Sequence, residues 1–210
     1  MSTKPDVLVN AGLCAAHFPM EVQEVIANKS LLDSSATISV RPLSLSADIP
    51  AIYRWVSQDH PADRWSSAGN PLRELEEAYA SIIRSNFAQP FMGLINGAPV
   101  CQLDIYQTRQ DSISLCYAER PGDYGLHLLL APLCVQDQIA ALLQACLEHF
   151  FSFPEVTRIV TDVEIGNEWM NRLFKKAGFL SSGKIQLPYK TAHLYICTRA
   201  SLLTTLSASN

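Results

Sequence analysis

The chain has 210 residues, of which 48% are hydrophobic and 17% charged, a composition that suits a packed globular protein and argues against a disordered one. Its formal net charge of -4 gives no general attraction to nucleic acid or to anionic membranes, so we expect neither as a partner. The six cysteines lie far apart without a C-x-x-C pair, which predicts reduced thiols, no metal site and a cytoplasmic location. No hydrophobic run approaches the length of a membrane span.

The first part of the chain is predicted to pass from an irregular segment into a strand and two helices. Residues 1–36 show no sustained hydrophobic period, and we interpret them as an appendage with at most one short helix, over 19–32. Residues 38–40 predict a first strand and 48–57 a helix. A second helix is predicted from Asn70, because apolar residues follow at helical spacing: Leu72, Leu75, Tyr79, Ile82 and Ile83.

In the middle of the chain the hydrophobic period changes to two. Residues 91–95 and 100–106 flank Asn96-Gly97, the strongest short signal for a β-hairpin. The later elements are predicted as strands over 113–117, 125–130, 158–163, 180–187 and 192–197, with helices over 137–151 and 167–177.

This order of elements predicts an α/β fold with a mixed, mostly antiparallel sheet and helices on both faces. We expect one domain over residues 37–200 and a tail over 201–210. No internal repeat or linker divides the chain.

Four strings of residues carry a resemblance to one protein family. They are Tyr53-Arg54-Trp55 with Trp65, PFMGLINGAPVCQLDIY at 90–106, GDYGLHLLLAP at 122–132, and DVEIGNEWMNRLFKKAGF at 162–179. In this order they resemble the siderophore-biosynthesis N-acyltransferases of the GNAT fold, and GLHLLLAP is the most specific of them. The resemblance covers about residues 38–198 and implies a GNAT fold for this chain.

The resemblance also implies an activity. Members of that family transfer an acetyl or succinyl group from acyl-coenzyme A to the hydroxylamine nitrogen of an N-hydroxylated lysine or diamine. It therefore implies acetyl-CoA or succinyl-CoA as co-substrate, an N-hydroxylated amine as small-molecule partner, no metal, and a monomer or homodimer.

Three residues match the catalytic positions of the family. His127 matches its histidine, and Asp162 and Glu164 fill its two carboxylate positions with Asp and Glu exchanged. A hydroxylamine is neutral at pH 7 but loses a proton as it attacks, and an imidazole is a natural acceptor for that proton. By strand alternation the two carboxylates share a face, where one could hold the imidazole tautomer. Outside this string, His127 would fit a core histidine and the carboxylates a solvated strand end.

The resemblance implies further site residues, which we expect to contact the two substrates. Those expected to line the acceptor site are Trp55, Trp65, Asp104 and Tyr106. Those expected to contact coenzyme A are Leu129, Leu130, Gln136, Asp137, Gln138, Ile139 and Asn167.

The segment before the central helix departs from the common GNAT pattern. GNAT proteins place a glycine-rich loop there, whose backbone N–H groups hold the pyrophosphate of coenzyme A. Residues 134–140 contain no glycine, and Asp137 puts a negative charge beside the expected phosphates. Asp137 would instead suit an N-cap of this helix.

Two alternatives to the siderophore hypothesis therefore stay open. One is a GNAT acetyltransferase for another amine. The other is a non-catalytic GNAT-like binding subunit, for which the glycine-free loop is the main argument.

Overall fold

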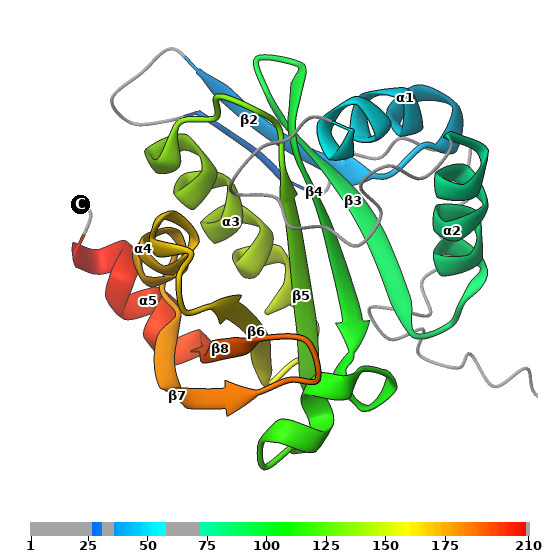
Figure 1. Ribbon diagram of the computed structural model, residues 1–210. Helices are drawn as coiled ribbons and strands as arrows, with labels where there is room; N and C mark the ends of the chain where they lie inside the picture. The colour runs from blue at the N-terminus through cyan, green and yellow to red at the C-terminus, as the bar shows by residue number, and fades with distance from the viewer. Residues whose placement is uncertain (1–26, 31–35, 58–71, 209–210) are drawn as a thin grey trace, which may run out of the picture.

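The computed structural model describes residues 27–30, 36–57 and 72–208. Its strands form one sheet in the order β1-β2-β3-β4-β5-β6-β8-β7 (Figure 1). These are β1 (Ala27–Ser30), β2 (Thr37–Pro42), β3 (Ala88–Ile95), β4 (Ala98–Gln107), β5 (Asp123–Leu130), β6 (Arg158–Glu164), β7 (Leu180–Gln186) and β8 (Thr191–Thr198). The helices are α1 (Leu45–Val56), α2 (Leu72–Arg84), α3 (Gln136–Phe150), α4 (Glu168–Lys176) and α5 (Arg199–Ala208), with short 3-10 turns η1 (Thr108–Gln110) and η2 (Ser112–Cys116).

The hairpin between β3 and β4 turns where the sequence predicts it. Asn96 has φ 50° and Gly97 has φ 76°, and two consecutive positive φ angles are the requirement of a type I′ turn. The turn brings Ile95 opposite Ala98 and so sets the register of the two strands. Successive side chains of β4 then point to opposite faces of the sheet.

Helices cover both faces of the sheet, as expected. On one face α3 buries Leu142, Cys146 and Phe150, and α4 and α5 extend the same hydrophobic core. Phe150 packs its ring 5.5 Å from that of Phe91 on β3. On the other face α1 and α2 form a second cluster over Met92. In Figure 1, α3, α4 and α5 lie to the left of the sheet and α1 and α2 to the right.

The sheet opens between β5 and β6, which are the only parallel neighbours among the described strands. Their pairing covers three positions and ends at Gly125 opposite Val160. Beyond it, β5 continues to Leu130 beside β4, and β6 continues to Glu164 beside β8. The strands that carry His127 and Glu164 are therefore parallel neighbours that separate at their carboxyl ends, as the GNAT resemblance implies.

The predicted strand over 113–117 is wrong, because this segment forms the 3-10 turn η2. The Asp111 carboxylate accepts a hydrogen bond from the backbone N–H of Ile113 at 2.9 Å and caps the turn. Ile113 is fully buried from this turn, so its apolar character reflects burial and not a strand.

Both ends of the described chain differ from the prediction. Ala27–Ser30 forms a strand that pairs with β2, whereas we predict a short helix over 19–32. The remaining residues of that predicted helix, 19–26 and 31–32, lie outside the described residues. The predicted tail begins inside α5, which buries Leu202 against the core. Thr198 and Ser201 exchange backbone-to-side-chain hydrogen bonds at its start, at 3.0 and 3.1 Å. Within the described segments, no helix combines the length and the hydrophobicity that a membrane crossing needs.

Candidate active site

Polar side chains from neighbouring elements gather where β5 and β6 separate, on the sheet face that α1 and α2 cover. Because side chains alternate along a strand, this face receives Asp104 and Tyr106 from β4, His127 from β5 and Asp162 from β6. Asp111 comes from the start of η2, and Lys190 from the turn between β7 and β8. We call these six residues the His127 cluster: Asp104, Tyr106, Asp111, His127, Asp162 and Lys190.

Tyr106 lies against the His127 ring. Their ring centroids are 4.5 Å apart at an interplanar angle of 38°. Tyr106 is opposite Gly125 in the register, and a Cβ on Gly125 would come within 2.1 Å of the Tyr106 Cζ. Glycine is therefore required for the tyrosine ring to lie across β5 and meet the imidazole.

Asp111 is a member of the cluster that the sequence analysis missed. Its Oδ2 lies 4.0 Å from the His127 Nε2, and its Oδ1 is held by the Ile113 N–H. With a strand predicted over 113–117, Asp111 is interpreted as a loop residue before that strand, and its place beside His127 is not predicted. The available signal was an aspartate two residues before a buried isoleucine, a pattern typical of a capped turn.

Burial favours the neutral form of the His127 imidazole. Burial lowers the pKa of His127 below its ordinary value, although 38% of its side-chain area is open to solvent. The carboxylates of Asp111 and Asp162 oppose this shift, and the Lys190 ammonium adds to it. The ring is therefore mostly uncharged at neutral pH and able to accept a proton.

The two predicted carboxylates of β6 have different environments. The side chain of Asp162 is 8% exposed, and its Oδ2 lies 2.5 Å from the Lys190 Nζ. Glu164 is half-buried one alternate position further along, and its backbone carbonyl accepts a hydrogen bond from the Asn171 Nδ2 at 3.0 Å. Of the two, Asp162 is a carboxylate whose charge acts on His127, as does that of Asp111.

Asp104 is the cross-strand neighbour of His127 and ends a chain of buried hydrogen bonds. The Tyr79 hydroxyl on α2 donates to the Gln102 Oε1 at 2.9 Å, and the Gln102 Nε2 donates to Asp104 at 2.6 Å. Burial raises the pKa of Asp104 to about 7, against the opposing effect of the Gln102 hydrogen bond. Asp104 is thus a carboxyl group that can change its charge near neutral pH.

Of the two tryptophans expected at the acceptor site, the structure describes only Trp55. Trp55 is buried in the hydrophobic cluster beneath α1 and α2, where it acts as a core residue. Trp65 lies outside the described residues.

The amino end of α3 presents backbone donors to its surroundings. Its N-cap is Val135, which makes no side-chain cap, and the first bond into the helix runs from Ile139 N to the Val135 carbonyl at 3.1 Å. The N–H groups of Gln136, Asp137 and Gln138 therefore have no acceptor within the helix. This end suits an anion such as a pyrophosphate.

Asp137 is not the N-cap that we expected. Its Oδ1 lies 2.5 Å from the Lys176 Nζ of α4, so its negative charge is offset within the protein. The Gln136 side chain also reaches α4, donating to the Trp169 carbonyl at 2.9 Å. Before the helix, Leu133 adopts φ 65°, a left-handed conformation that commonly belongs to glycine.

The remaining residues expected to contact coenzyme A lie along the same opening. Leu129 and Leu130 belong to the part of β5 beyond its last pairing with β6, and their side chains are buried on opposite faces. The Asn167 Oδ1 caps α4 by accepting the Met170 N–H at 3.1 Å. Among the described residues, no group of three histidine, cysteine or acidic side chains is arranged to hold a metal ion.

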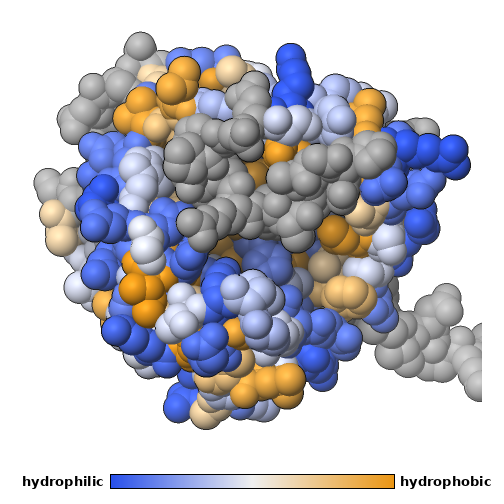
Figure 2. Space-filling view, viewed as in Figure 1, coloured by the Kyte–Doolittle hydropathy of each residue, from blue (hydrophilic) through white to orange (hydrophobic). Residues whose placement is uncertain are grey.

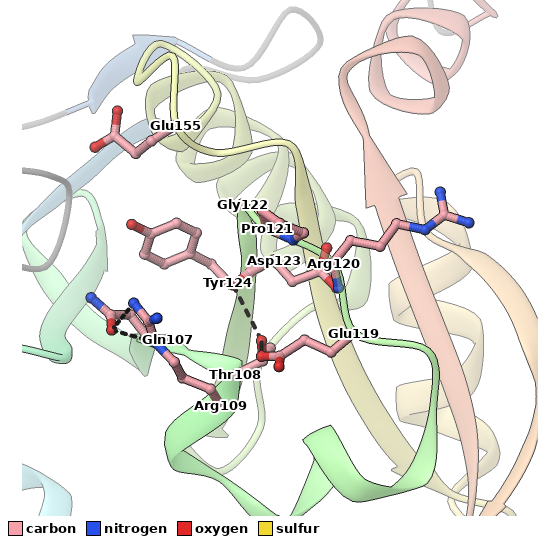
Figure 3. A pocket seen from close by; sticks show the side chains of 10 residues that line it. All are labelled: Gln107, Thr108, Arg109, Glu119, Arg120, Pro121, Gly122, Asp123, Tyr124 and Glu155. Atoms are coloured by element: carbon pink, nitrogen blue, oxygen red, sulfur yellow. Dashed lines mark hydrogen bonds between the residues drawn. The ribbon is translucent and has the colours of Figure 1, made fainter.

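A separate open cavity of about 420 Å³ lies at the amino end of β5 (Figure 3). Several of its polar side chains bind one another: Thr108 donates to Glu119 at 2.6 Å, and Arg109 donates to Gln107 at 3.0 Å. The Asp123 carboxylate is paired with Arg158. None of the residues that line this cavity belongs to the His127 cluster. On the face that Figure 2 shows, hydrophobic residues are dispersed among hydrophilic ones.

Comparison with known proteins adds a family and several relatives. The family described as "Acetyltransferase (GNAT) domain" matches residues 44–187. A lysine N-acyltransferase from Mycobacterium sp. (strain MCS) is 27% identical over 164 residues, which cover 77% of this chain and 67% of that protein. An N-hydroxyputrescine acetyltransferase from Acinetobacter baumannii is 24% identical over 168 residues, or 80% of each chain. A crystal structure of an aminoglycoside acetyltransferase with coenzyme A and kanamycin is 26% identical and has a TM-score of 0.70, covering 80% of this chain and 99% of that one.

Proposed function

The chain belongs to the acetyltransferase (GNAT) domain family, and on this basis we propose that it acylates the nitrogen of an N-hydroxylated lysine or diamine. It is an acyl-coenzyme A-dependent N-acyltransferase with the GNAT fold. The finer assignment, to hydroxamate siderophore biosynthesis with acetyl-CoA or succinyl-CoA as donor, is our proposal. The donor also implies a cytoplasmic reaction.

One observation carries the choice of acceptor: His127 is a base of lowered pKa at the point where β5 and β6 separate. An alkylammonium has a pKa of about 10 and must lose one proton before it can attack and another during attack. A hydroxylamine is already neutral and needs a base only for the second proton. A weak imidazole base therefore suits the N-hydroxylated acceptor better than its parent amine. The similarity to the N-hydroxyputrescine acetyltransferase supports the same choice.

The proposed reaction is direct transfer between the two substrates. The acceptor nitrogen attacks the thioester carbonyl and forms the N–C bond, His127 takes the proton from that nitrogen, and the C–S bond breaks. Coenzyme A leaves as the thiolate and gains a proton to become the thiol. Asp111 and Asp162 stabilise the imidazolium that forms in this step, since both carboxylates act on the His127 charge.

The opening between β5 and β6 is our proposed site for the donor. The N–H groups at the start of α3, which have no acceptor within the helix, would hold its pyrophosphate, and Lys176 offsets the charge of Asp137 beside it. The backbone of Leu129 and Leu130, unpaired toward β6, would face the pantetheine arm and thioester. These features support a coenzyme A site at this opening although the loop before α3 contains no glycine.

A second candidate is acylation of a polycationic amine. It is favoured by the similarity to the aminoglycoside acetyltransferase and by the excess of carboxylates in the His127 cluster, where Asp104, Asp111 and Asp162 face the single cation Lys190. The non-catalytic alternative is disfavoured by two features: the polar residues gathered around His127, and the backbone N–H groups at the amino end of α3 that have no acceptor within the helix.

Thiol release from acetyl-CoA and succinyl-CoA tests the proposal, with N-hydroxyputrescine, N-hydroxylysine, their parent amines and kanamycin as acceptors. We expect turnover on the hydroxylated acceptors and very little on the parents. Faster turnover on kanamycin would favour the second candidate. Absence of turnover together with absence of acyl-coenzyme A binding in calorimetry would favour a binding subunit.

A further inference from the structure

Tyr106 has a buried hydroxyl without a hydrogen-bond partner in the described part of the chain. The residue is 5% exposed. Other tyrosines of the core pair theirs: Tyr79 donates to Gln102, Tyr117 to Asp123 and Tyr195 to Asn171, each at 2.9 Å. A buried tyrosine hydroxyl normally finds a partner, because leaving it unpaired costs free energy. The exception at Tyr106 therefore points to a partner supplied by a ligand.

The position of this hydroxyl is fixed by two neighbours of the Tyr106 ring, Gly125 and His127. The ring crosses β5 over Gly125, since the hydroxyl oxygen would lie 2.6 Å from a Cβ at that residue. Gly125 forms the last pair with Val160 before β5 and β6 separate. The other side of the ring packs on His127 at 4.5 Å. The hydroxyl thus lies at the base of the opening, beside the proposed catalytic imidazole.

The surrounding charges determine what the hydroxyl can bind. Burial raises the pKa of Tyr106 well above its ordinary value, and the charges of Asp111, Asp162, Tyr189 and Asp104 raise it further. The phenol therefore stays protonated and acts as a donor. The same carboxylates repel an anionic partner, so the group that accepts this hydrogen bond is a neutral oxygen.

We propose that the Tyr106 hydroxyl donates a hydrogen bond to the N-hydroxyl oxygen of the acceptor and thereby selects the hydroxylated amine over its parent. This inference rests on the proposed function. With the acceptor nitrogen facing His127, the oxygen bonded to that nitrogen lies toward the Tyr106 ring, which packs against the imidazole at a tilt. A parent amine has no such oxygen and leaves the Tyr106 hydroxyl buried and unpaired, and sites of this kind discriminate strongly against the analogue that lacks the group.

The test compares Tyr106→Phe with the control Tyr117→Phe, whose hydroxyl is bonded to Asp123 at the other end of β5. The measurements are kcat/KM with acetyl-CoA for N-hydroxyputrescine and putrescine, the Kd of each acceptor in the presence of coenzyme A, and Tm. We expect Tyr106→Phe to lower kcat/KM and affinity for N-hydroxyputrescine about three- to tenfold and to leave those for putrescine unchanged. The Tm of Tyr106→Phe should not fall, because the hydroxyl has no hydrogen-bond partner to lose among the residues that the structure describes. Tyr117→Phe should leave the ratio between the acceptors unchanged.

Three results would overturn the inference. If both acceptors lose equally in Tyr106→Phe, the hydroxyl contacts the thioester carbonyl instead. If the preference for N-hydroxyputrescine survives in full, Tyr106 does not recognise the hydroxyl, while the proposed function still stands. If the wild-type protein itself shows no preference in turnover or affinity, the inference and the proposed function fail together.

Discussion

Asp104 on β4 lies directly opposite His127 on β5 in the antiparallel register, and burial raises the pKa of this carboxyl group to about 7. A carboxyl group that is neutral below this pH and charged above it therefore neighbours the proposed base. Burial shifts the two pKa values in opposite directions, that of His127 down and that of Asp104 up. Their effects on stability have opposite signs, which makes them separable by substitution.

The wild-type protein should lose stability as the pH rises, and Asp104→Asn should remove this loss. The folded-state pKa of Asp104, about 7, lies above its unfolded value, so the folded protein binds more protons between the two values and loses stability as pH rises through 7. Asparagine keeps the oxygen that accepts the Gln102 hydrogen bond but does not ionise. We expect the wild-type protein to lose on the order of 1–3 kcal/mol relative to the variant between about pH 5 and 8, measured by urea unfolding. Asp137→Asn, at an exposed pair with Lys176, is the control and should show no such trend; equal trends in both variants would contradict the prediction.

His127→Ala should lower turnover on an N-hydroxylated acceptor by about a hundredfold or more, the usual contribution of a general base. The side chain is partly open to solvent, so we expect only a modest loss of stability. Because the pKa of His127 lies below its ordinary value, wild-type kcat/KM should fall only under mildly acidic conditions, and this acidic limb should vanish in the variant. An unchanged profile in His127→Ala would assign the base to another group.

Asp111→Asn should move the acidic limb of the pH profile to lower pH. The Asp111 carboxylate raises the pKa of His127, so its removal lets burial lower that pKa further. Asparagine can still accept the Ile113 hydrogen bond that caps η2. The comparison is kcat/KM of the two proteins between about pH 5 and 8. A loss of activity that is the same at every pH would instead indicate that Asp111 only orients the ring.

The sequence predicts the fold well because its local signals agree with the tertiary structure. Asn96-Gly97 supplies two positive φ angles, and Leu142, Cys146 and Phe150 show the face that α3 buries. The segment 113–117 fails because a short apolar run looks alike in a strand and in a capped 3-10 turn. At the site, the string GLHLLLAP points to His127 as a candidate residue. The place of Asp111 beside His127 and the pairing of Asp137 with Lys176 depend instead on contacts between elements that are distant in sequence. Such contacts produce no local sequence pattern from which they could be predicted.

Lys176→Met should weaken acyl-coenzyme A binding severalfold, because it leaves the Asp137 charge uncompensated at the start of α3. Asp137→Asn should have the opposite effect, since it removes a negative charge near the proposed pyrophosphate site and releases Lys176. Arg172→Met removes a cation from an exposed pair with Glu168 on the same helix and serves as the control. Calorimetry at low and high salt gives both affinities, and the differences should shrink at high salt. Equal effects of Lys176→Met and Arg172→Met would show that the pyrophosphate binds elsewhere.

Gly125→Ala should destabilise the protein by about 1–3 kcal/mol, because the new Cβ would lie 2.1 Å from the Tyr106 Cζ and the ring must move. Gly166→Ala is the matched control, since no atom lies within 4 Å of its Cβ position. A double-mutant cycle separates the clash from a general effect of alanine at position 125. In a Tyr106→Ala background the ring is gone, so Gly125→Ala should cost little more than Gly166→Ala. Urea unfolding of the four proteins gives the coupling energy. A full cost that persists without the tyrosine ring would mean that the backbone of β5, and not Tyr106, requires glycine, and Tyr106 would lose its fixed place at the opening.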